Sequence, residues 1–381
     1  CGGSFGACPT AGGLFSPDPN SQPTPAGSTP TSNVDFLSSD LRQPSVWKAN
    51  LAFERELGLW DMVFSAEYIK TKVNDGIYYR FLNLGAPTRI GPDGRPLFYT
   101  AQGLNSACWT STGGTITTGA TCTGFRTRAG SNASFNNVLL AENTDKGSGE
   151  NLTIALTRPM VNDWAWSVAY SYTEATDVNP LTSSVANSNW LNRSVFDPNE
   201  EVASRSNYVN RDRLIASIQW QHAFWGDNKT SVGLFYEGRK GKPYSWTYNN
   251  DLNGDGVFGN DLMYIPTRGD NTVVFRDLNG NGSADEEAAF WNVVNSTPEL
   301  RRAQGGVTKR NDSFSPWVNT FDLRVSQEFP GFFDGNKVTL TLDVLNVGNL
   351  LNRKWGRTDE IGFPLNRSFV NFGGIDASGR Y

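Results

Sequence analysis

Strict alternation of large and small side chains is the feature of this sequence that most constrains its fold. Between residues 163 and 173, every second side chain is large: Trp164, Trp166, Val168, Tyr170 and Tyr172. The residues between them are small or polar. Because successive side chains of a β-strand point to opposite faces, this stretch predicts a strand with one large, mostly aromatic face and one small, polar face.

The same alternation recurs along most of the chain. It is found in residues 51–57, 152–157, 214–224, 317–329 and 338–344. The predicted strands are about 9–13 residues long, which is close to the length of a tilted membrane-spanning strand and longer than most soluble strands. A large face on such strands suits contact with lipid.

The connections between these strands alternate in length. The short ones comprise residues 58–61, 160–163, 225–229 and 331–336, and the long ones residues 74–136, 175–206 and 250–317. Short turns at one end and long loops at the other are typical of outer-membrane barrels, whereas loops this long are uncommon in compact soluble domains. We therefore predict an all-β fold, an antiparallel transmembrane β-barrel present in part, with about 10–11 strands and long extracellular loops. The only helix we expect is a short one within residues 285–295.

The small, polar face of two neighbouring strands carries several charges. Its members are Asp322, Arg324, Ser326 and Glu328, with Asp343 on the following strand. A buried soluble core would not hold such a row unpaired, but the water-filled lumen of a barrel would. The solvated outer face of a soluble sheet remains an alternative, because alternation alone does not separate the two.

Composition and charge exclude several functional classes. The net charge is -5 and Lys and Arg are scattered, so we expect no nucleic-acid partner. The only histidine, His222, shares a strand face with Trp220 and Phe224, which suits a membrane interface, and no GxSxG nucleophile motif accompanies it. We therefore expect no enzymatic activity and no catalytic residue. With a mean hydropathy of -0.43, the chain has no apolar run long enough for a transmembrane helix.

The four cysteines fall into two local pairs, Cys1 with Cys8 and Cys108 with Cys122. Both pairs lie in segments rich in Gly, Ser and Thr, without the histidines or CxxC spacing of a zinc site. Two small disulfides that close surface loops fit this pattern and imply an oxidising compartment. Free thiols are the alternative.

Two similar acidic runs in the third long loop are the strongest candidates for a metal site. In each run, oxygen-bearing side chains alternate with other residues and glycines allow a sharp turn, as at the start of a calcium-binding loop. The candidate ligands are Asp251, Asn253, Asp255 and Asp261 in the first run, and Asp277, Asn279, Asn281 and Asp285 in the second. Neither run has the terminal Glu of an EF-hand, so we expect a structural Ca²⁺ or, alternatively, plain Asn/Asp/Gly turns.

Several short motifs resemble the barrel of Oar-like TonB-dependent receptors. They are PSVWKANL from Pro44, NTDKG from Asn143, DLNGDG from Asp251 with NDLMYIP after it, and FDLRV from Phe321. The run DVLNVGNLLN from Asp343 resembles the penultimate-strand region of TonB-dependent barrels in general. Each motif is weak alone, and their order, from about residue 40 to the end, carries the resemblance.

The resemblance implies a barrel of about 22 strands that is closed by an N-terminal plug and energised by the TonB complex. On this expectation, residues 1–44 are a polar loop segment. Residues 45–381 are the C-terminal part of an outer-membrane β-barrel whose plug and N-terminal strands are absent from this chain. No cofactor other than Ca²⁺ is expected.

The function expected from this resemblance is TonB-dependent transport across the cell outer membrane. A ligand of unknown identity, for which a peptide is one option, would be captured by the extracellular loops. The partners would be outer-membrane lipid and the TonB complex, the latter reached through the missing N-terminal part. The alternatives are a passive surface barrel or adhesin, and a soluble calcium-stabilised carbohydrate-binding β-domain.

Overall fold

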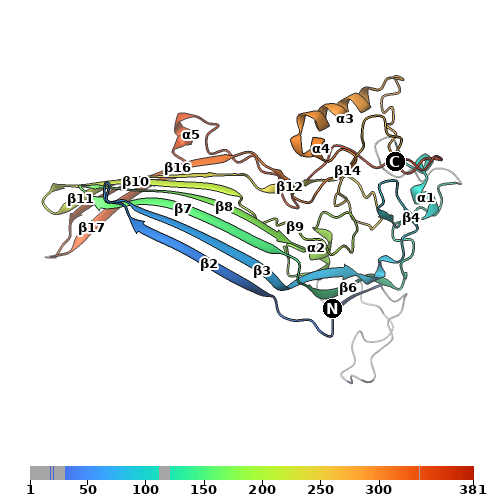
Figure 1. The fold of residues 1–381 in the computed structure, drawn as a ribbon, viewed down its shortest axis with the longest axis horizontal. Helices are drawn as coiled ribbons and strands as arrows, with labels where there is room; N and C mark the ends of the chain where they lie inside the picture. The colour runs from blue at the N-terminus through green and yellow to red at the C-terminus, as the bar shows by residue number, and fades with distance from the viewer. Residues whose placement is uncertain (1–17, 19, 21–30, 111–120, 334) are drawn as a thin grey trace.

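One large curved sheet dominates the computed structural model, which describes residues 18, 20, 31–110, 121–333 and 335–381 (Figure 1). Within these residues the sheet has 11 strands, as expected from the sequence. They are β1 (Ser32–Leu37), β2 (Ser45–Glu56), β3 (Val63–Phe81), β6 (Phe135–Thr144), β7 (Ser148–Val161), β8 (Trp164–Asp177), β9 (Ser204–Arg205), β10 (Asp212–Trp225), β11 (Asn228–Arg239), β16 (Val318–Pro330) and β17 (Lys337–Val344).

Short elements fill the long connections between these strands. The short strands are β4 (Arg89–Ile90), β5 (Pro96–Leu97), β12 (Pro243–Trp246), β13 (Tyr264–Ile265), β14 (Gly306–Val307), β15 (Ser313–Phe314) and β18 (Asn366–Arg367). The helices are η1 (Leu82–Leu84), α1 (Ala101–Leu104), η2 (Ser106–Cys108), α2 (Ala186–Leu191), α3 (Asp285–Ser296), α4 (Pro298–Arg302) and α5 (Gly348–Leu351). The short helix expected within residues 285–295 is confirmed as α3. No helix in the described residues has both the length and the apolar character needed to span a membrane.

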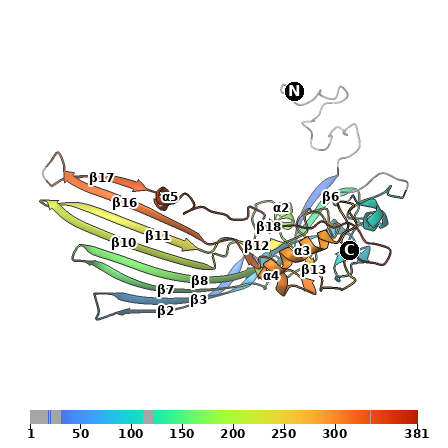
Figure 2. The same cartoon turned by 90° about the horizontal axis from the view of Figure 1, so that it is seen from above.

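The two ends of the long strands differ, as the loop lengths predict. The hairpin turns β2–β3, β7–β8, β10–β11 and β16–β17 gather at one end, on the left in Figure 1. The long connections lie at the other end, where they form an irregular mass around α2, α3 and α4 (Figures 1 and 2). We call this mass the cap and define it as residues 82–110, 121–134, 178–211, 240–315 and 360–381.

Strand register places the large side chains of neighbouring strands in the same rows. One row crosses five strands and consists of Trp166, Ile218, Leu234, Leu323 and Val344. The adjacent row lies on the opposite face and is small or polar: Ala165, Gln219, Gly233, Arg324 and Asp343. The alternation in the sequence therefore becomes two continuous surfaces, and the side chains of the large row are exposed or half-buried, none of them buried.

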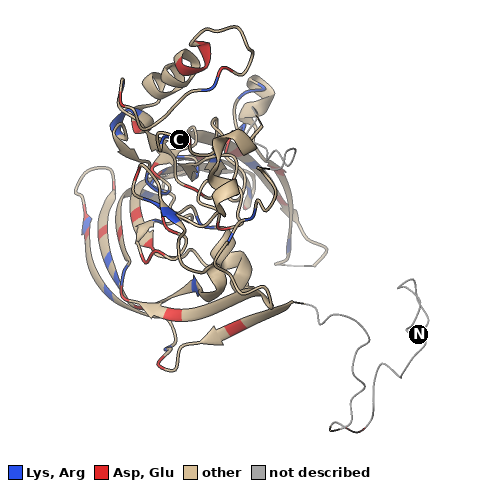
Figure 3. Ribbon diagram, turned by 90° about the vertical axis from the view of Figure 1, so that its right-hand side faces the viewer, with Lys and Arg blue, Asp and Glu red and all other residues tan. Residues whose placement is uncertain are grey.

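The charged row on the polar face is paired. Arg324 binds Asp343 through two hydrogen bonds, with Nε 2.6 Å from Oδ1 and Nη2 3.0 Å from Oδ2. The Nζ of Lys337 lies 2.7 Å from Glu328 Oε2. Viewed from the cap end, the sheet forms an arc and carries charges of both signs along its strands (Figure 3). Paired, partly solvated charges of this kind suit a water-filled lumen.

The N-terminal part of the chain departs from the expected loop. Residues 1–44 were expected to form a polar loop segment, but β1 lies within them and pairs in parallel with β6. The loop expected from residue 74 begins later, because β3 continues to Phe81 and its second half pairs with β6. Within the described residues, β2 pairs only with β3 and β17 only with β16.

The turn end carries a cluster of aromatic side chains. The rings of Trp164, Trp220, His222, Phe224 and Trp225 lie in a chain of contacts, with centroids 4.8–6.4 Å apart. The Nδ1 of His222 is 2.8 Å from the carboxylate of Asp163 in the neighbouring turn. Amphipathic rings at the end of a membrane-spanning strand are typical of an aromatic girdle, and the geometry gives His222 this structural role.

Candidate functional site

The cap is organised around an aromatic core. Its members come from segments far apart in the sequence: Tyr99, Trp109, Trp246, Tyr248, Phe290, Trp291 and Phe372. The ring centroids of Trp109 and Phe372 are 5.0 Å apart, and those of Tyr99 and Trp109 are 5.7 Å apart. Burial of a large apolar side chain contributes about 1.5–3 kcal/mol, so this core fixes how the long connections are arranged.

A disulfide links two cysteines of the cap. Cys108 and Cys122 form the predicted bond, and both cysteines are buried. The two cysteines are 14 positions apart in the sequence, and Cys108 directly precedes Trp109 of the core. The other predicted pair, Cys1 and Cys8, lies outside the described residues.

The first acidic run is buried in the centre of the cap. The side chains of Asp251, Asn253, Asp255 and Asp261 are at most 1% exposed. The carboxylate of Asp251 accepts hydrogen bonds from the backbone N–H groups of Gly254 and Gly256, at 2.6 and 2.8 Å. Asp261 accepts from the N–H of Leu252 at 2.7 Å. The structure therefore brings the four predicted residues together in one tight loop.

Asn260 joins this loop, although the sequence pattern did not single it out. Its side chain is 3% exposed, and its Nδ2 donates to Asp255 Oδ2 at 3.0 Å. Its Oδ1 is buried without a hydrogen-bond partner. A buried amide oxygen without a donor is costly, and among the described residues this atom is the one buried side-chain acceptor of the loop that lacks a partner.

Arg95 is the second residue that the sequence pattern did not reveal. Its Nε binds Asp93 Oδ2 at 2.7 Å, and its Nη1 lies 3.4 Å from Asp261 Oδ1. Its Nη2 donates to the carbonyl oxygen of Leu262 at 2.6 Å. All three charged side chains are fully buried. The guanidinium therefore ties residues 93–95 to a loop more than 160 positions away, and no local pattern could have shown this.

The carboxylates of the first run have strongly perturbed pKa values. Burial, together with the neighbouring Asp255 and Asp261, raises the pKa of Asp251 well above its ordinary value. Burial and Asp261 raise the pKa of Asp255 to about 7. Burial raises that of Asp261 to about 6, although Arg95 opposes this shift. Of these three buried carboxylates only Asp261 contacts the guanidinium of Arg95, which Asp93 also engages, and no ion pair reaches Asp251 or Asp255 within the described residues.

The second acidic run repeats the turn but not the environment. Asp277 accepts hydrogen bonds from the N–H groups of Gly280 and Gly282, at 2.7 Å each, as Asp251 does in the first run. The side chains of Asp277, Asn279, Asn281 and Asp285 are all exposed. Hydrogen bonds from Ser283 and Asn279 lower the pKa of Asp285. Within the described residues, no three Asp, Glu, His or Cys side chains converge as a metal site, so an ion at either run would need amide oxygens as well.

The same glycine-to-alanine substitution can be compared at equivalent positions of the two acidic runs. Gly254 and Gly280 both have positive φ angles, +79° and +71°. A Cβ atom on Gly254 would lie 2.8 Å from the backbone N of Tyr99, whereas one on Gly280 would meet nothing within 4 Å. We expect Gly280→Ala to cost about 1–2 kcal/mol of backbone strain, and Gly254→Ala to cost about 1 kcal/mol more through overlap with Tyr99. Urea unfolding followed by tryptophan fluorescence measures the difference, and equal losses would contradict the close packing of the first run.

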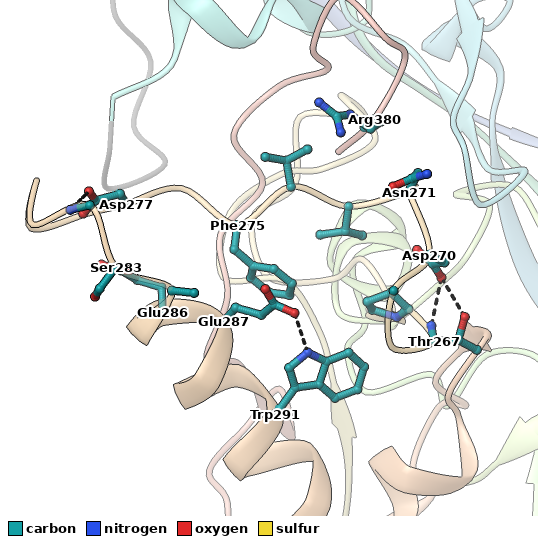
Figure 4. Close-up of a pocket in the computed structure, with 16 residues that line it drawn as sticks. Thr267, Asp270, Asn271, Phe275, Asp277, Ser283, Glu286, Glu287, Trp291 and Arg380 are labelled. Atoms are coloured by element: carbon teal, nitrogen blue, oxygen red, sulfur yellow. Dashed lines mark hydrogen bonds between the residues drawn. The ribbon is translucent and has the colours of Figure 1, made fainter.

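Two adjoining cavities open beside this core. The larger, of about 690 Å³, is mainly apolar, and its aromatic lining is Tyr248, Tyr264, Phe275, Phe290, Phe369, Phe372 and Tyr381. The smaller, of about 460 Å³, lies between α3 and the loop before it (Figure 4). Its acidic lining is Asp270, Asp277, Glu286 and Glu287. Phe275 lines both cavities, so the apolar and acidic spaces are neighbours.

A third cavity, of about 390 Å³, lies where the sheet meets the cap. Its lining comes from the connection before β10, from the end of β11 and from the C-terminal segment. Three of the residues are basic, namely Arg239, Lys240 and Lys242, and none is acidic. The three cavities therefore differ in chemistry: one is aromatic, one is acidic and one is basic.

Comparison with known proteins places the chain in a family. A search of curated proteins finds no match. Among solved structures, the chain is similar to the outer membrane transporter YddB from Escherichia coli, with 10% sequence identity and a TM-score of 0.39. The alignment covers 84% of this chain and 31% of that one, so the chain spans less than a third of that transporter. The family model for the outer membrane beta barrel domain matches residues 3–379, and the chain belongs to this family of outer-membrane proteins.

Proposed function

We propose that this chain is part of a TonB-dependent receptor that takes up a ligand captured by its extracellular cap. The observation that carries the proposal is the aromatic cavity of about 690 Å³, which is lined by long connections from several parts of the chain. These connections lie at the end of the sheet opposite the hairpin turns (Figure 1). A volume of roughly 300–1,000 Å³ with a mainly apolar lining is typical of a small-ligand site. The ordered family motifs, from PSVWKANL to DVLNVGNLLN, support the dependence on TonB.

The chemistry of the cavities favours a peptide as the ligand. The aromatic cavity suits apolar side chains. The acidic cavity next to it offers four carboxylates that make no ion pair within the described residues, and its one basic residue, Arg380, is already bound to Asp376. An amino terminus or a basic side chain would be attracted there. A short peptide combines both properties, whereas an anionic ligand would be repelled.

Two adjacent alanines on α3 allow a matched test of this site. Ala288 and Ala289 are both exposed, but only Ala289 lines the aromatic cavity. With a fluorescein-labelled casein hydrolysate as the probe, we expect Ala289→Trp to fill the cavity and to reduce binding to the protein at least tenfold. Ala288→Trp should bind as the wild type does. Equal binding by the two variants would show that the aromatic cavity is not the site where the ligand binds.

The dependence on TonB is tested separately from binding. Uptake of the same labelled hydrolysate by cells that make the full protein should stop when the gene for TonB is deleted, while binding at the cell surface persists. The alternative, a passive surface barrel or adhesin, predicts that deletion changes neither. A soluble carbohydrate-binding domain is no longer an alternative, because the family is an outer-membrane one.

We further propose that the first acidic run holds a structural Ca²⁺ ion. Two observations support an ion there: the burial of three carboxyl groups, those of Asp251, Asp255 and Asp261, in one loop, and the unsatisfied Oδ1 of Asn260. Oxygen ligands of this kind suit a hard divalent cation, and its charge would offset the cost of burying the carboxylates. The second run has neither feature, so the proposal is limited to the first.

Removal of calcium should destabilise the cap. We expect a chelator such as EGTA to lower the melting temperature of the cap by several degrees, because a ligand that binds only the folded state stabilises it by mass action. Added Ca²⁺ should restore the melting temperature. Asp285→Asn in the second run should leave the response unchanged, whereas Asp255→Asn should abolish it. The same melting temperature with and without chelator would refute the ion.

A further inference from the structure

The basic cavity between the sheet and the cap plays no part in the peptide binding proposed above. Its full lining is Thr182, Asn207, Tyr208, Val209, Asn210, Arg239, Lys240, Lys242, Phe363 and Leu365. These residues come from three separate parts of the chain, and Arg239 at the end of β11 places the cavity where the sheet meets the cap. The cavity is thus built by both the cap and the end of the sheet.

The positive charge of this cavity is only partly neutralised. Arg239 is bound to Glu360, which also accepts a hydrogen bond from the backbone N–H of Lys242 at 3.2 Å. Within the described residues, the ammonium groups of Lys240 and Lys242 make no close ion pair and no hydrogen bond, although they act at longer range on the carboxylates of Asp212 and Glu360. No Asp or Glu lines the cavity. Two ammonium groups without a close ion pair beside one cavity attract an anion.

Two polar groups in the lining also lack partners. Thr182 Oγ1 and Asn210 Oδ1 are buried, and neither makes a hydrogen bond within the protein. Buried polar atoms are satisfied in the great majority of cases, so each unsatisfied atom calls for a partner. A hydroxyl group both donates and accepts, which allows Thr182 to bind a phosphate oxygen or a sugar hydroxyl.

The remaining wall of the cavity is aromatic and apolar. Tyr208 and Phe363 expose 68% and 63% of their surface, and Val209 and Leu365 are buried. Large exposed rings next to basic side chains can stack on the C–H face of a sugar ring. The volume of about 390 Å³ exceeds the needs of a bare anion and leaves room for a sugar that carries one.

We propose that this cavity binds a phosphorylated sugar, either as a soluble sugar phosphate or as the phosphorylated head group of an outer-leaflet lipid. Lysines bind phosphate as point charges, whereas a carboxylate is best matched by a free arginine fork, and the only arginine of the lining is held by Glu360. Lys240 and Lys242 bind the phosphate, Thr182 bonds its oxygens, and Tyr208 and Phe363 hold the sugar. This site does not depend on TonB-driven uptake.

The test measures binding to the complete protein, purified from outer membranes in a non-ionic detergent. One arm titrates glucose 1-phosphate, with glucose as the uncharged comparison. The other arm measures binding to phosphatidylcholine vesicles with and without lipid A. The double variant Lys240→Gln/Lys242→Gln removes the free positive charge. A control variant, Lys48→Gln/Lys354→Gln, makes the same charge change at two exposed lysines outside the cavity.

We expect the double variant to lose at least tenfold in affinity, and the control variant to bind as the wild type does. Thr182→Val, which keeps the charge, should lose affinity to a smaller extent. Binding of glucose 1-phosphate would identify a soluble ligand, and binding of lipid A vesicles alone would identify the lipid head group. Absence of both, or equal affinities of the double variant and the control variant, would overturn the proposal.

Discussion

Replacing Arg95 with methionine should cost the cap about 3–5 kcal/mol of unfolding free energy, because the substitution leaves two buried carboxylates without their counter-charge. Asp93 and Asp261 are fully buried and both bind this guanidinium. Burial alone would disfavour the charged form of Arg95, but the two carboxylates together raise its pKa. The charge is therefore retained in the folded state, and the three groups act as a unit.

An exposed ion pair serves as the control for this prediction. Arg357 lies 2.9 Å from Asp359, and both side chains are more than half exposed. Arg357→Met should cost at most about 1 kcal/mol, since solvent screens such pairs. Urea unfolding of the detergent-solubilised protein, followed by tryptophan fluorescence, measures both variants. Equal stability of the two would show that Arg95 does not hold the cap together.

A second variant separates the loss of charge balance from the loss of packing. Arg95→Met/Asp261→Asn removes one charge of each sign, so part of the lost stability should return. Stability returns if the loss caused by Arg95→Met comes mainly from leaving a buried carboxylate without a counter-charge. If the double variant is as unstable as Arg95→Met, the lost hydrogen bond to the Leu262 carbonyl and the lost packing dominate instead.

The strands of this protein are predictable from sequence because their determinants are local. Alternation from Trp164 to Tyr172 fixes which face each side chain occupies, and the short turns bring neighbouring strands into register. The helix α3 is equally local. The pairing of β1 with β6 was not predicted from the sequence. It joins segments about 100 residues apart, and residues 32–37 lack the alternation that indicates a strand.

The candidate site was predictable only in part. The first acidic run was recognised from its spacing, but its burial was not, because burial depends on Tyr99 and Arg95 from another connection. The second run has nearly the same spacing and lies in solvent. Local pattern therefore predicts the turn, whereas the surrounding connections decide whether the turn is exposed or forms part of a core.

Adjacent residues on β10 should respond in opposite ways to the same added charge. Ile218 lies on the large face, in the row with Trp166 and Leu234, and Gln219 lies on the polar face. Both are near the middle of the strand, where the membrane is most apolar. We expect Ile218→Lys to cost about 2–4 kcal/mol, because it places an ammonium group against lipid.

Gln219→Lys should be tolerated, with a change within about 0.5 kcal/mol, because its side chain faces a polar surface. Unfolding in lipid vesicles measures both variants, and the amount of each protein recovered in the outer-membrane fraction gives a second readout. The comparison is decisive because the two residues share the strand, the depth and the added charge, and differ only in the face they occupy. A greater loss for Gln219→Lys would reverse the assignment of faces, and equal losses would mean that neither face contacts lipid.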